Sequence, residues 1–297
     1  MSRSAIVGVD SGGTKTAVLA DGAGGTRAVT GPGAQLLRDG VEGAAETVRQ
    51  LVQEALAGAG CRALVVGIAG AGRPESCAAL ADALGERLGP VPIRVFHDAH
   101  VAYHGAWGDE SGALLLVGTG SLVLARDENG ATHRAGGWGA SLGDDGSGTA
   151  LGRGAVRALL ATLDGGPPSV FPEIAADRFG LDSSESVLRA VHTDRRPLAS
   201  FAPLALAAAE AGDWAAETLL RSEVNALAKQ AGWLATRLGD RVRPRLRYLG
   251  GLSNEPVYVA ALEDALGRHL PGWTVEPCPV EPAEGALALA RELAEGG

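Results

Sequence analysis

The sequence predicts an α/β protein built from two duplicated domains, and three observations support this fold class. The length of 297 residues suits two domains of ordinary size. Apolar runs of strand length alternate with segments whose apolar residues recur at helical spacing. A set of three strands, opening with a strand and a glycine-rich turn, occurs near residue 5 and again near residue 113. From this repeat we expect domains at 1–108 and 109–297, with the boundary near 107–111.

The first expected domain starts with three strands and continues with alternating helices and strands. Strands are predicted at 5–10, 14–20 and 26–30, because each is a short apolar or β-branched run bounded by turn residues. A helix at 42–57 follows from apolar residues at helical spacing and from Gly58, which ends it. Further elements are expected at 63–68 (strand), 74–88 (helix), 93–96 (strand) and 99–106 (helix).

The second expected domain repeats this opening and then becomes mostly helical. Strands are predicted at 113–117, at 122–125 and up to Arg134, with Asn129-Gly130 as a hairpin turn. The segment 136–165 is a glycine-rich loop that leads into a helix, and 172–238 has a mainly helical pattern, which we interpret as an insertion. The last expected elements are 246–249 (strand), 257–270 (helix), 273–275 (strand) and 283–295 (helix).

The stretch VGVDSGGTKT (7–16) nearly matches a P-loop, but its lysine comes one residue too late. A P-loop also joins a strand to a helix whose N-terminus holds the phosphate. Here a second strand is predicted after the glycines, so we expect the turn to be the tip of a β-hairpin. Glycine is common at hairpin tips, so these residues alone leave a phosphate-binding role and a purely structural role open.

Composition and charge limit the classes of partner. A formal net charge of -9 argues against nucleic acid, because neutralising phosphates needs clustered Lys and Arg. No apolar run is long enough to span a bilayer, and the N-terminus lacks the pattern of a signal peptide. The cysteines, Cys61, Cys77 and Cys278, are widely separated, which disfavours a zinc site or a disulfide framework and suits a reducing, cytoplasmic location.

Four motifs follow one another along the chain: VGVDSGGTKT with Asp10, FHDAH with Asp98, VGTGS (117–121) and YLGGLS (248–253). Together with GGWG and LGDDGSG in 136–148, they resemble the BadF/BadG/BcrA/BcrD ATPase family of the sugar kinase, actin and heat-shock chaperone superfamily. That family includes N-acetylglucosamine kinase and bacterial glucosamine kinase. The resemblance implies two actin-like (ribonuclease H-like) domains with a nucleotide and sugar cleft between them, and it leaves open that the last helix packs back on the first domain.

The resemblance implies that both glycine-rich turns hold the phosphates of ATP. Backbone N–H groups in such turns form concave anion sites without needing a lysine. Asp10 is expected to hold Mg²⁺ through water, which suits an ion that keeps most of its hydration shell. Structural alternatives are a solvated strand residue for Lys15 and a tight strand–helix turn for Gly250-Gly251. The residues carried over for nucleotide binding are Ser11, Gly12, Gly13, Thr14, Lys15, Thr119, Gly120, Ser121, Gly250 and Gly251.

For catalysis, the resemblance implies that Asp98 is the general base, which orients the attacking hydroxyl and accepts its proton. The structural alternative is an N-cap for the helix at 99–106. His97 and His100 lack partners at metal-ligand spacing, and we interpret them as bystanders. Asp144 matches the acidic residue that binds sugar hydroxyls in the family, whereas Asp145 is expected to cap the following helix.

Further sugar contacts carried over from the family are Gln35, Asp98, Trp138 and the turn Gly118-Thr119-Gly120. Trp138 either walls the sugar pocket or packs against the protein, and the residues leave both open. Kinases of the family usually have Asn where this chain has Gln35, so the pocket is expected to differ in shape.

We therefore predict an ATP- and Mg²⁺-dependent kinase, a homodimer by resemblance, that phosphorylates the 6-hydroxyl of N-acetylglucosamine or glucosamine. A kinase for another hexose is one alternative. A second is an activator ATPase of a radical dehydratase or reductase, but relatives of that kind carry an iron–sulfur cluster on cysteines, and the isolated cysteines here argue against it. A third is a nucleotide-dependent binding or regulatory protein without turnover. An appended DNA-binding domain would support this third alternative.

Overall fold

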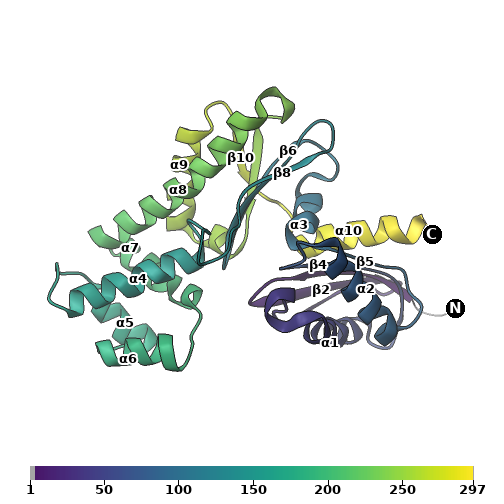
Figure 1. Cartoon of the computed structure of the whole chain (residues 1–297), viewed down its shortest axis with the longest axis horizontal. Coiled ribbons are helices and arrows are strands. Elements are labelled where there is room, and N and C mark those ends of the chain that lie inside the picture. Colours follow the sequence, from purple (N-terminus) through teal and green to yellow (C-terminus); the bar gives the residue numbers. More distant parts are fainter. Residues whose placement is uncertain (1–3, 297) are drawn as a thin grey trace. The chain divides into compact units, whose positions relative to one another are not determined.

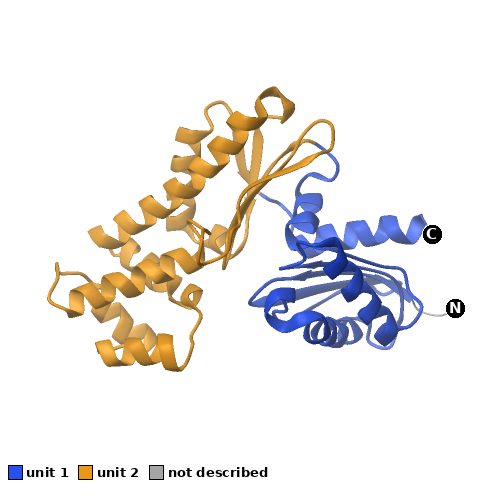
Figure 2. Cartoon of the chain, in the orientation of Figure 1, with its two compact units in different colours: residues 1–110, 278–297 blue, residues 111–277 orange. Residues whose placement is uncertain are grey.

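The structure is a computed structural model that describes residues 4–296 (Figure 1). The chain forms two compact units: unit 1 comprises residues 1–110 and 278–297, and unit 2 comprises residues 111–277 (Figure 2). Unit 2 is shorter than the range 109–297 expected from the sequence, because the last helix packs within unit 1. Among the described residues, no helix combines the length and the apolar character needed to cross a bilayer.

Unit 1 contains a five-stranded sheet in the order β3-β2-β1-β4-β5. The central strand β1 pairs antiparallel with β2 and parallel with β4, and β4 pairs parallel with β5. The strands are β1 (Ser4–Ser11), β2 (Lys15–Gly22), β3 (Gly25–Pro32), β4 (Gly60–Ile68) and β5 (Ile93–His97). The helices are α1 (Leu36–Leu56), α2 (Pro74–Leu88), α3 (Asp98–Trp107) and α10 (Pro282–Glu295).

Each element predicted for the first domain is present, with one difference at the start of α1. The sequence pattern places this helix at 42–57, whereas α1 begins at Leu36. Gly40 interrupts it with a backbone φ of 66°, a conformation that glycine adopts readily. The amphipathic stripe begins only after this kink, which explains why the pattern misses the first helical turn.

Strand β1 is buried on both faces, as expected of the centre of a sheet covered by helices on both sides. Val7 and Val9 are fully buried in the cluster formed with α1 and α2. Ile6 packs on the opposite face, against a cluster that includes Ala286 of α10. Figure 1 shows α1 and α10 on opposite sides of this sheet. Side chains along a strand alternate between the faces, so the middle of this strand, residues 5–9, carries only apolar or very small residues.

Unit 2 repeats the sheet of unit 1, in the order β10-β9-β6-β7-β8. Its central strand β6 again pairs antiparallel with the next strand, β7, and parallel with a later one, β9. The predicted duplication is therefore confirmed by the pairing of the strands. The strands are β6 (Gly112–Val117), β7 (Ser121–Arg126), β8 (Thr132–Gly136), β9 (Arg245–Leu249) and β10 (Thr274–Pro277).

The helices of unit 2 cover one face of this sheet and form the predicted helical insertion. Leu115 and Val117 of β6 are fully buried in one core with Leu227 of α8 and Tyr258 of α9. The α-helices are α4 (Gly148–Leu163), α5 (Phe171–Phe179), α6 (Ser184–Leu188), α7 (Ala202–Glu210), α8 (Trp214–Leu238) and α9 (Pro256–His269). Short helical turns are η1 (Arg189–Thr193), η2 (Leu198–Phe201), η3 (Gly239–Arg241) and η4 (Gly251–Asn254).

We predict that Gly8→Ala destabilises the protein by about 1–3 kcal/mol, the cost of overpacking a tight contact. A Cβ on Gly8 would lie 2.2 Å from the backbone nitrogen of Leu287, so α10 would have to move off β1. Gly85→Ala is the matched control, because a Cβ there meets nothing within 4 Å and Ala favours the interior of α2. It should stabilise by up to about 1 kcal/mol. Urea denaturation measures both, and an unaffected Gly8→Ala variant would contradict the close packing of α10.

Candidate functional site

The turn between β1 and β2 is a hairpin tip, as predicted. Gly12 donates its N–H to the carbonyl of Lys15 at 2.9 Å, which closes the turn. The Ser11 side chain is fully buried; its hydroxyl donates to the Ala34 carbonyl at 2.9 Å and lies 2.7 Å from the Thr16 hydroxyl. The Ser11 hydroxyl therefore holds the turn itself, so a phosphate contact by this residue would involve its main chain.

Arg38, in the first turn of α1, fixes the β1–β2 turn from outside the predicted motifs. Its guanidinium donates to the carbonyl of Gly13 at 2.8 Å and to the carbonyl of Gly33 at 2.7 Å. It also pairs with the Asp39 carboxylate at 2.7 Å. A charged donor shared by two loop carbonyls holds the loops together. Sequence reasoning missed Arg38, because its partners are main-chain atoms that carry no residue-specific signal.

Gln35 lies between β3 and α1 and points toward the same turn. Its N–H donates to Asp39 Oδ2 at 2.9 Å. Its side-chain amide nitrogen is 3.8 Å from the position that a Cβ on Gly13 would take. The structure thus brings a residue predicted to contact the sugar beside a residue predicted to contact the nucleotide, both within unit 1.

Asp10, near the end of β1, is a half-buried carboxylate with an unfavourable charge environment. Burial and repulsion from Asp98 raise the pKa of Asp10 to about 7; exposed Lys15 opposes this rise, and Glu281 adds to it. A bound cation would relieve both the burial and the repulsion. Mg²⁺ fits this position, because it prefers carboxylate oxygen and needs only one or two such ligands beside water. Within residues 4–296, no three His, Cys, Asp or Glu side chains gather as a metal-binding group.

Asp98 is brought toward Asp10 by the register of the parallel strands. Ser11 of β1 pairs with Ile68 of β4, and Ile68 pairs with His97 of β5. Asp10 and Asp98 therefore flank the same row across the sheet, at the ends where these three strands finish. This row accounts for the electrostatic coupling between the two carboxylates.

The contacts of His97 and Asp98 exclude the structural alternative for Asp98 and place His97 beside it. His97, and not Asp98, occupies the N-cap position of α3, although the Ala99 N–H lies 2.8 Å from Asp98 Oδ1 and 3.2 Å from His97 Nδ1. His97 Nδ1 lies 2.6 Å from Asp98 Oδ1, so His97 contacts the candidate base, and its interpretation as a bystander to metal binding stays a prediction. His100 stacks on Phe96 with 4.5 Å between the ring centroids. The side chain of Asp98 is 29% exposed and so remains accessible.

The turn between β6 and β7 in unit 2 is the counterpart of the β1–β2 turn. Gly118 donates its N–H to the Gly120 carbonyl at 2.9 Å. The start of α4 holds this turn: Gly148 donates to the Gly118 carbonyl at 2.8 Å, and the Thr149 hydroxyl donates to the Thr119 carbonyl at 2.7 Å. The first donors of α4 thus fix the turn, whose tip at Thr119 is exposed.

Asp144 lies directly beside this turn in unit 2. Its Oδ2 is 2.8 Å from the position that a Cβ on Gly120 would take, and its Oδ1 accepts the N–H of Gly139 at 3.1 Å. Burial raises the pKa of Asp144, the hydrogen bond from Gly139 opposes this rise, and Asp145 adds to it. The backbone φ of Asp144 is 63°, which a non-glycine residue keeps only where its surroundings enforce it. The structure therefore brings the predicted residues Asp144 and Gly120 together.

Asp145 does not cap α4, contrary to the sequence prediction. The N-cap is Ser147, whose hydroxyl accepts the Ala150 N–H at 3.2 Å. Asp145 Oδ2 instead accepts a hydrogen bond from Gln230 Nε2 at 2.6 Å, and its main-chain carbonyl accepts one from the Ser121 hydroxyl at 2.7 Å. Ser121 is buried, so its hydroxyl also serves the loop. Gln230 was missed because it lies 85 residues away, on a helix whose pattern shows only packing.

The loop before α4 is held from two further sides. Glu223 of α8 accepts the Gly146 N–H at 3.0 Å, and the fully buried Tyr258 of α9 donates its hydroxyl to the Gly146 carbonyl at 2.7 Å. The Tyr258 contact favours one conformation of the loop most strongly, because it is buried and breaking it leaves an unpaired polar group.

The structure bears on the structural alternatives for Trp138 and for the glycines after β9, while their ligand contacts stay predictions. Trp138 is 62% exposed, with the Arg134 guanidinium 4.2 Å from its ring centroid, so the ring is not a packing residue of the core. Gly250 has a φ of 124°, and a Cβ there would lie 2.3 Å from the Val117 carbonyl oxygen, so the structural need for glycine is confirmed. Gly251 is exposed, and a Cβ there would meet nothing within 4 Å.

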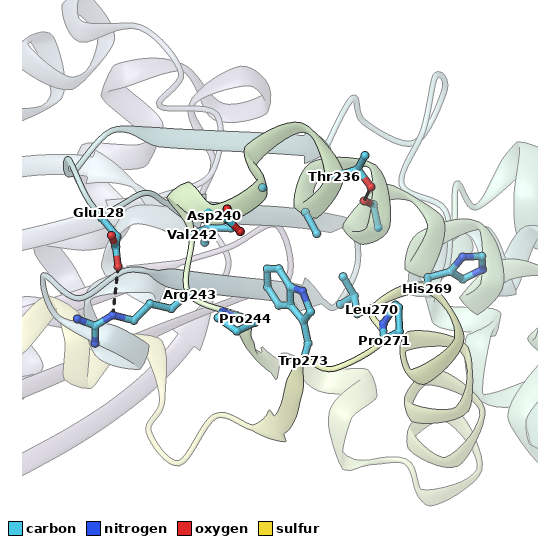
Figure 3. Close-up of a pocket in the computed structure, with 13 residues that line it drawn as sticks. Glu128, Thr236, Asp240, Val242, Arg243, Pro244, His269, Leu270, Pro271 and Trp273 are labelled. Atoms are coloured by element: carbon cyan, nitrogen blue, oxygen red, sulfur yellow. Dashed lines mark hydrogen bonds and ion pairs between the residues drawn. The ribbon is translucent and has the colours of Figure 1, made fainter.

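A separate pocket of about 480 Å³ lies in unit 2, at the end of α8 and beside the connection from α9 to β10 (Figure 3). Trp273 forms one wall, and the polar rim includes Asp240 and the ion pair of Glu128 with Arg243 at 3.7 Å. Its lining includes none of the residues predicted for the nucleotide, metal or sugar.

The duplicated sheets, each with a glycine-rich turn after its central strand, define the actin-like sugar kinase fold. A solved protein of Chromobacterium violaceum, provisionally assigned as an N-acetylglucosamine kinase, superposes with a TM-score of 0.75 at 26% identity, covering 98% of this chain and 99% of that one. A ROK family glucokinase of Streptomyces griseus, solved with glucose and AMPPNP, shares the fold with a TM-score of 0.64 at 22% identity, covering 99% of this chain and 100% of that one.

The chain belongs to the BadF/BadG/BcrA/BcrD ATPase family, which it matches over residues 7–290. The N-acetyl-D-glucosamine kinase of Dictyostelium discoideum is 26% identical, and the match covers 98% of each chain. The N-acetylmuramic acid/N-acetylglucosamine kinase of Clostridium acetobutylicum is 29% identical, and this match covers 61% of the chain and 62% of the relative, so it spans less than two thirds of that protein. These relatives are sugar kinases by name.

We predict that Asp10→Asn raises the melting temperature at pH 8 by about 2–6 °C in the absence of metal and nucleotide. Folding raises the pKa of Asp10 from 3.8 to about 7, so the folded state binds this proton more tightly. The resulting loss of stability grows as pH rises from about 4 to 7 and is complete above that range. The variant lacks this loss, so its advantage should vanish near pH 4.

Asp21→Asn is the matched control, because the hydrogen bond from Arg291 lowers the pKa of Asp21. This substitution should not stabilise the protein at pH 8. Thermal denaturation followed by circular dichroism measures both variants across the pH range. An Asp10→Asn protein that melts below the wild type at pH 8 would contradict the environment assigned to Asp10.

Proposed function

We propose that the protein is an ATP- and Mg²⁺-dependent kinase that phosphorylates the 6-hydroxyl of N-acetylglucosamine or glucosamine. The observation that carries this proposal is the pair of coupled carboxylates in unit 1, Asp10 and Asp98, at the ends of parallel strands. The carboxylate of Asp10 is half-buried and favours a bound cation. The carboxylate of Asp98 is held by the Ala99 N–H and remains accessible. Membership of the family and the names of the two relatives support the same reaction class.

Asp98 is proposed as the general base. Its carboxylate is held by the Ala99 N–H, yet its side chain remains 29% exposed. A carboxylate in this state can orient a sugar hydroxyl and accept its proton as the oxygen attacks the γ-phosphate. No larger chemical contribution is required of the base, because phosphoryl transfer depends mainly on positioning and charge stabilisation.

Asp10 is proposed to hold Mg²⁺, which would neutralise charge on the ATP phosphates when bound. The exposed N–H groups of the two glycine-rich turns, 11–14 and 118–121, are proposed to contact those phosphates. Lys15 adds positive charge beside the first turn. Gly251 has open space above it, which suits the approach of adenosine.

Asp144, Gln35, Trp138 and the turn 118–120 are proposed to bind the sugar. Asp144 is the strongest candidate, because its carboxylate lies beside the turn and burial disfavours leaving it without hydrogen-bond donors. A carboxylate can accept two sugar hydroxyls in fixed geometry. A homodimer and a cytoplasmic location stay predictions from the resemblance.

The alternative function, an activator ATPase with an iron–sulfur cluster, gains no support from the cysteines. Burial raises the pKa of Cys61 to about 11, which disfavours the thiolate that such a cluster needs. Neither of the two curated relatives described above is named as an activator of this kind.

We expect Mg-ATP to release ADP in a sugar-dependent manner, with N-acetylglucosamine or glucosamine preferred among a panel of hexoses and hexosamines. Asp98→Asn should lower kcat by about 100-fold or more, because it removes the proton acceptor and keeps the shape. Asp82→Asn, at an exposed position on α2, is the control and should match the wild type. No stimulation by any sugar would overturn the kinase proposal, and a fully active Asp98→Asn would overturn the base.

Asp144→Asn should raise KM for the sugar by about 10-fold or more while KM for ATP changes less than about 2-fold. A hydrogen bond to a charged group contributes about 1.5–3 kcal/mol, and the variant loses the charge but still accepts the Gly139 N–H. Asp177→Asn, exposed on α5, serves as the control in steady-state assays. Equal effects on both KM values would argue against sugar binding by Asp144.

A further inference from the structure

Arg38 joins two loops of unit 1 to which the proposed function gives different ligands. The turn 11–14 is proposed to contact the phosphates, and Gln35, after β3, is proposed to bind the sugar. The Arg38 guanidinium donates to the carbonyls of Gly13 at 2.8 Å and of Gly33 at 2.7 Å. We infer that Arg38 is a positioning residue, which holds the phosphate turn and Gln35 in one fixed arrangement. This inference rests on the proposed function.

The two loops touch through their main chains, and the Arg38 guanidinium spans the contact. A Cβ on Gly33 would lie 2.5 Å from the Gly12 carbonyl oxygen and 2.6 Å from the Lys15 nitrogen, so no side chain fits between the loops. Nη1 of Arg38 reaches the loop at Gly13, and Nη2 reaches the loop at Gly33. Because the guanidinium is a planar, rigid fork, it fixes the distance between these two carbonyls.

Asp39 holds Arg38 in place and extends the chain of contacts to Gln35. Its carboxylate accepts two hydrogen bonds from Arg38, from Nε at 2.7 Å and from Nη2 at 2.8 Å. Asp39 Oδ2 also accepts the Gln35 N–H at 2.9 Å. The hydrogen bond from Arg38 lowers the pKa of Asp39, burial opposes this change, and the bond from Gln35 adds to it, so the pair stays charged at neutral pH.

The donors of Arg38 are mostly engaged within unit 1, which favours positioning over direct binding of a ligand. A guanidinium has five N–H groups, and four of them donate to Asp39, Gly13 and Gly33. A charged donor that fixes a loop affects each ligand that the loop contacts. Small errors in the placement of binding groups lower affinity and rate strongly.

A second, buried link keeps the base of the turn in place without Arg38. The Ser11 hydroxyl donates to the Ala34 carbonyl at 2.9 Å and accepts the Ala34 N–H at 3.3 Å. The side chain of Arg38 is 47% exposed, so its removal leaves no cavity in the core. We therefore expect substitutions of Arg38 to leave the fold intact and to loosen the tip of the turn at Gly12 and Gly13.

Arg38→Met keeps the aliphatic length of the side chain and removes its donors. It should raise KM for ATP and KM for the sugar by about 10-fold or more each, because both loops lose a charged hydrogen bond. Arg38→Lys keeps the charge and part of the donors, so its two KM values should lie between those of Arg38→Met and the wild type. Arg27→Met, exposed on β3 and paired with Ala20, is the control and should match the wild type.

Three kinetic outcomes would overturn the inference. A rise in KM for ATP alone would indicate direct phosphate binding by Arg38. A lower kcat with both KM values unchanged would indicate only a smaller folded fraction. An Arg38→Lys variant with KM values as high as those of Arg38→Met would show that the charged donor does not hold the loops.

A double-substitution cycle tests whether Asp39 acts on the turn through Arg38. Asp39→Asn removes the charge but still accepts the Gln35 N–H, and it should raise KM for ATP by about 3-fold or more. In an Arg38→Met background the same substitution should change KM for ATP by less than about 1.5-fold, because the group that it holds is gone. Equal effects of Asp39→Asn in both backgrounds would contradict the chain of contacts.

The turn can also be followed without any activity. The Gly12 N–H closes the turn on the Lys15 carbonyl, so its hydrogen exchange reports opening of the tip. Without ligands, Arg38→Met should speed exchange at Gly12 by about 10-fold or more and leave the buried Val18 of β2 within about 2-fold. Nitrogen-15 NMR measures both amides, and unchanged exchange at Gly12 would overturn the inference. A wild-type protein without sugar-dependent ADP release would refute the proposed function, while the exchange would still decide whether Arg38 holds the turn.

Discussion

The central strand of each sheet is the constraint on which the rest of the structure depends. β1 has an antiparallel neighbour on one side and a parallel neighbour on the other, and so has β6. The antiparallel neighbour forces a tight hairpin immediately after the strand, while the parallel neighbours end at the same edge of the sheet. A glycine-rich turn and the first residues of later helices therefore meet at one edge, which in unit 1 places Asp10 near Asp98.

This arrangement needs helices packed very closely on the strands. Gly8 lies against the backbone of α10, and Gly67 of β4 lies against Val101 of α3, where a Cβ would be 2.2 Å from a methyl group. The helices can approach the sheet because these positions lack side chains. That approach packs the end of the chain against β1 and gives unit 1 an element from beyond residue 277.

The proposed site residues are held at a cost in local stability. Asp10 is an ionisable group whose charge the folded protein disfavours, and Asp144 has a left-handed backbone. Such features persist where surrounding contacts outweigh them, and they are frequent at functional sites. In unit 2 the supporting contacts are polar and at least partly buried: Gln230, Glu223 and Tyr258 bind three different groups of the loop before α4. The conformation of this loop is thus fixed by α8 and α9, for which no ligand contact is proposed.

The sequence by itself determined the elements, the duplication and the residues that follow each central strand. Short apolar runs and turn glycines are local signals, so the hairpin at 11–14 and the role of Gly250 as a turn residue could be predicted from the chain alone. The first turn of α1 could not, because Gly40 breaks the pattern there. Likewise, the partner of Asp145 and the cap of α3 depend on side-chain geometry that spacing does not encode.

Only the tertiary structure decided which side chains act together. Strand register placed Asp10 and Asp98 on either side of the row formed by Ser11, Ile68 and His97. Helix packing brought Gln230 to Asp145 and Arg38 to Gly13. These pairs join residues that lie far apart in the chain. The sequence therefore named the candidate base, but the folded chain showed what holds it, because hydrogen bonds depend on distance and direction in space.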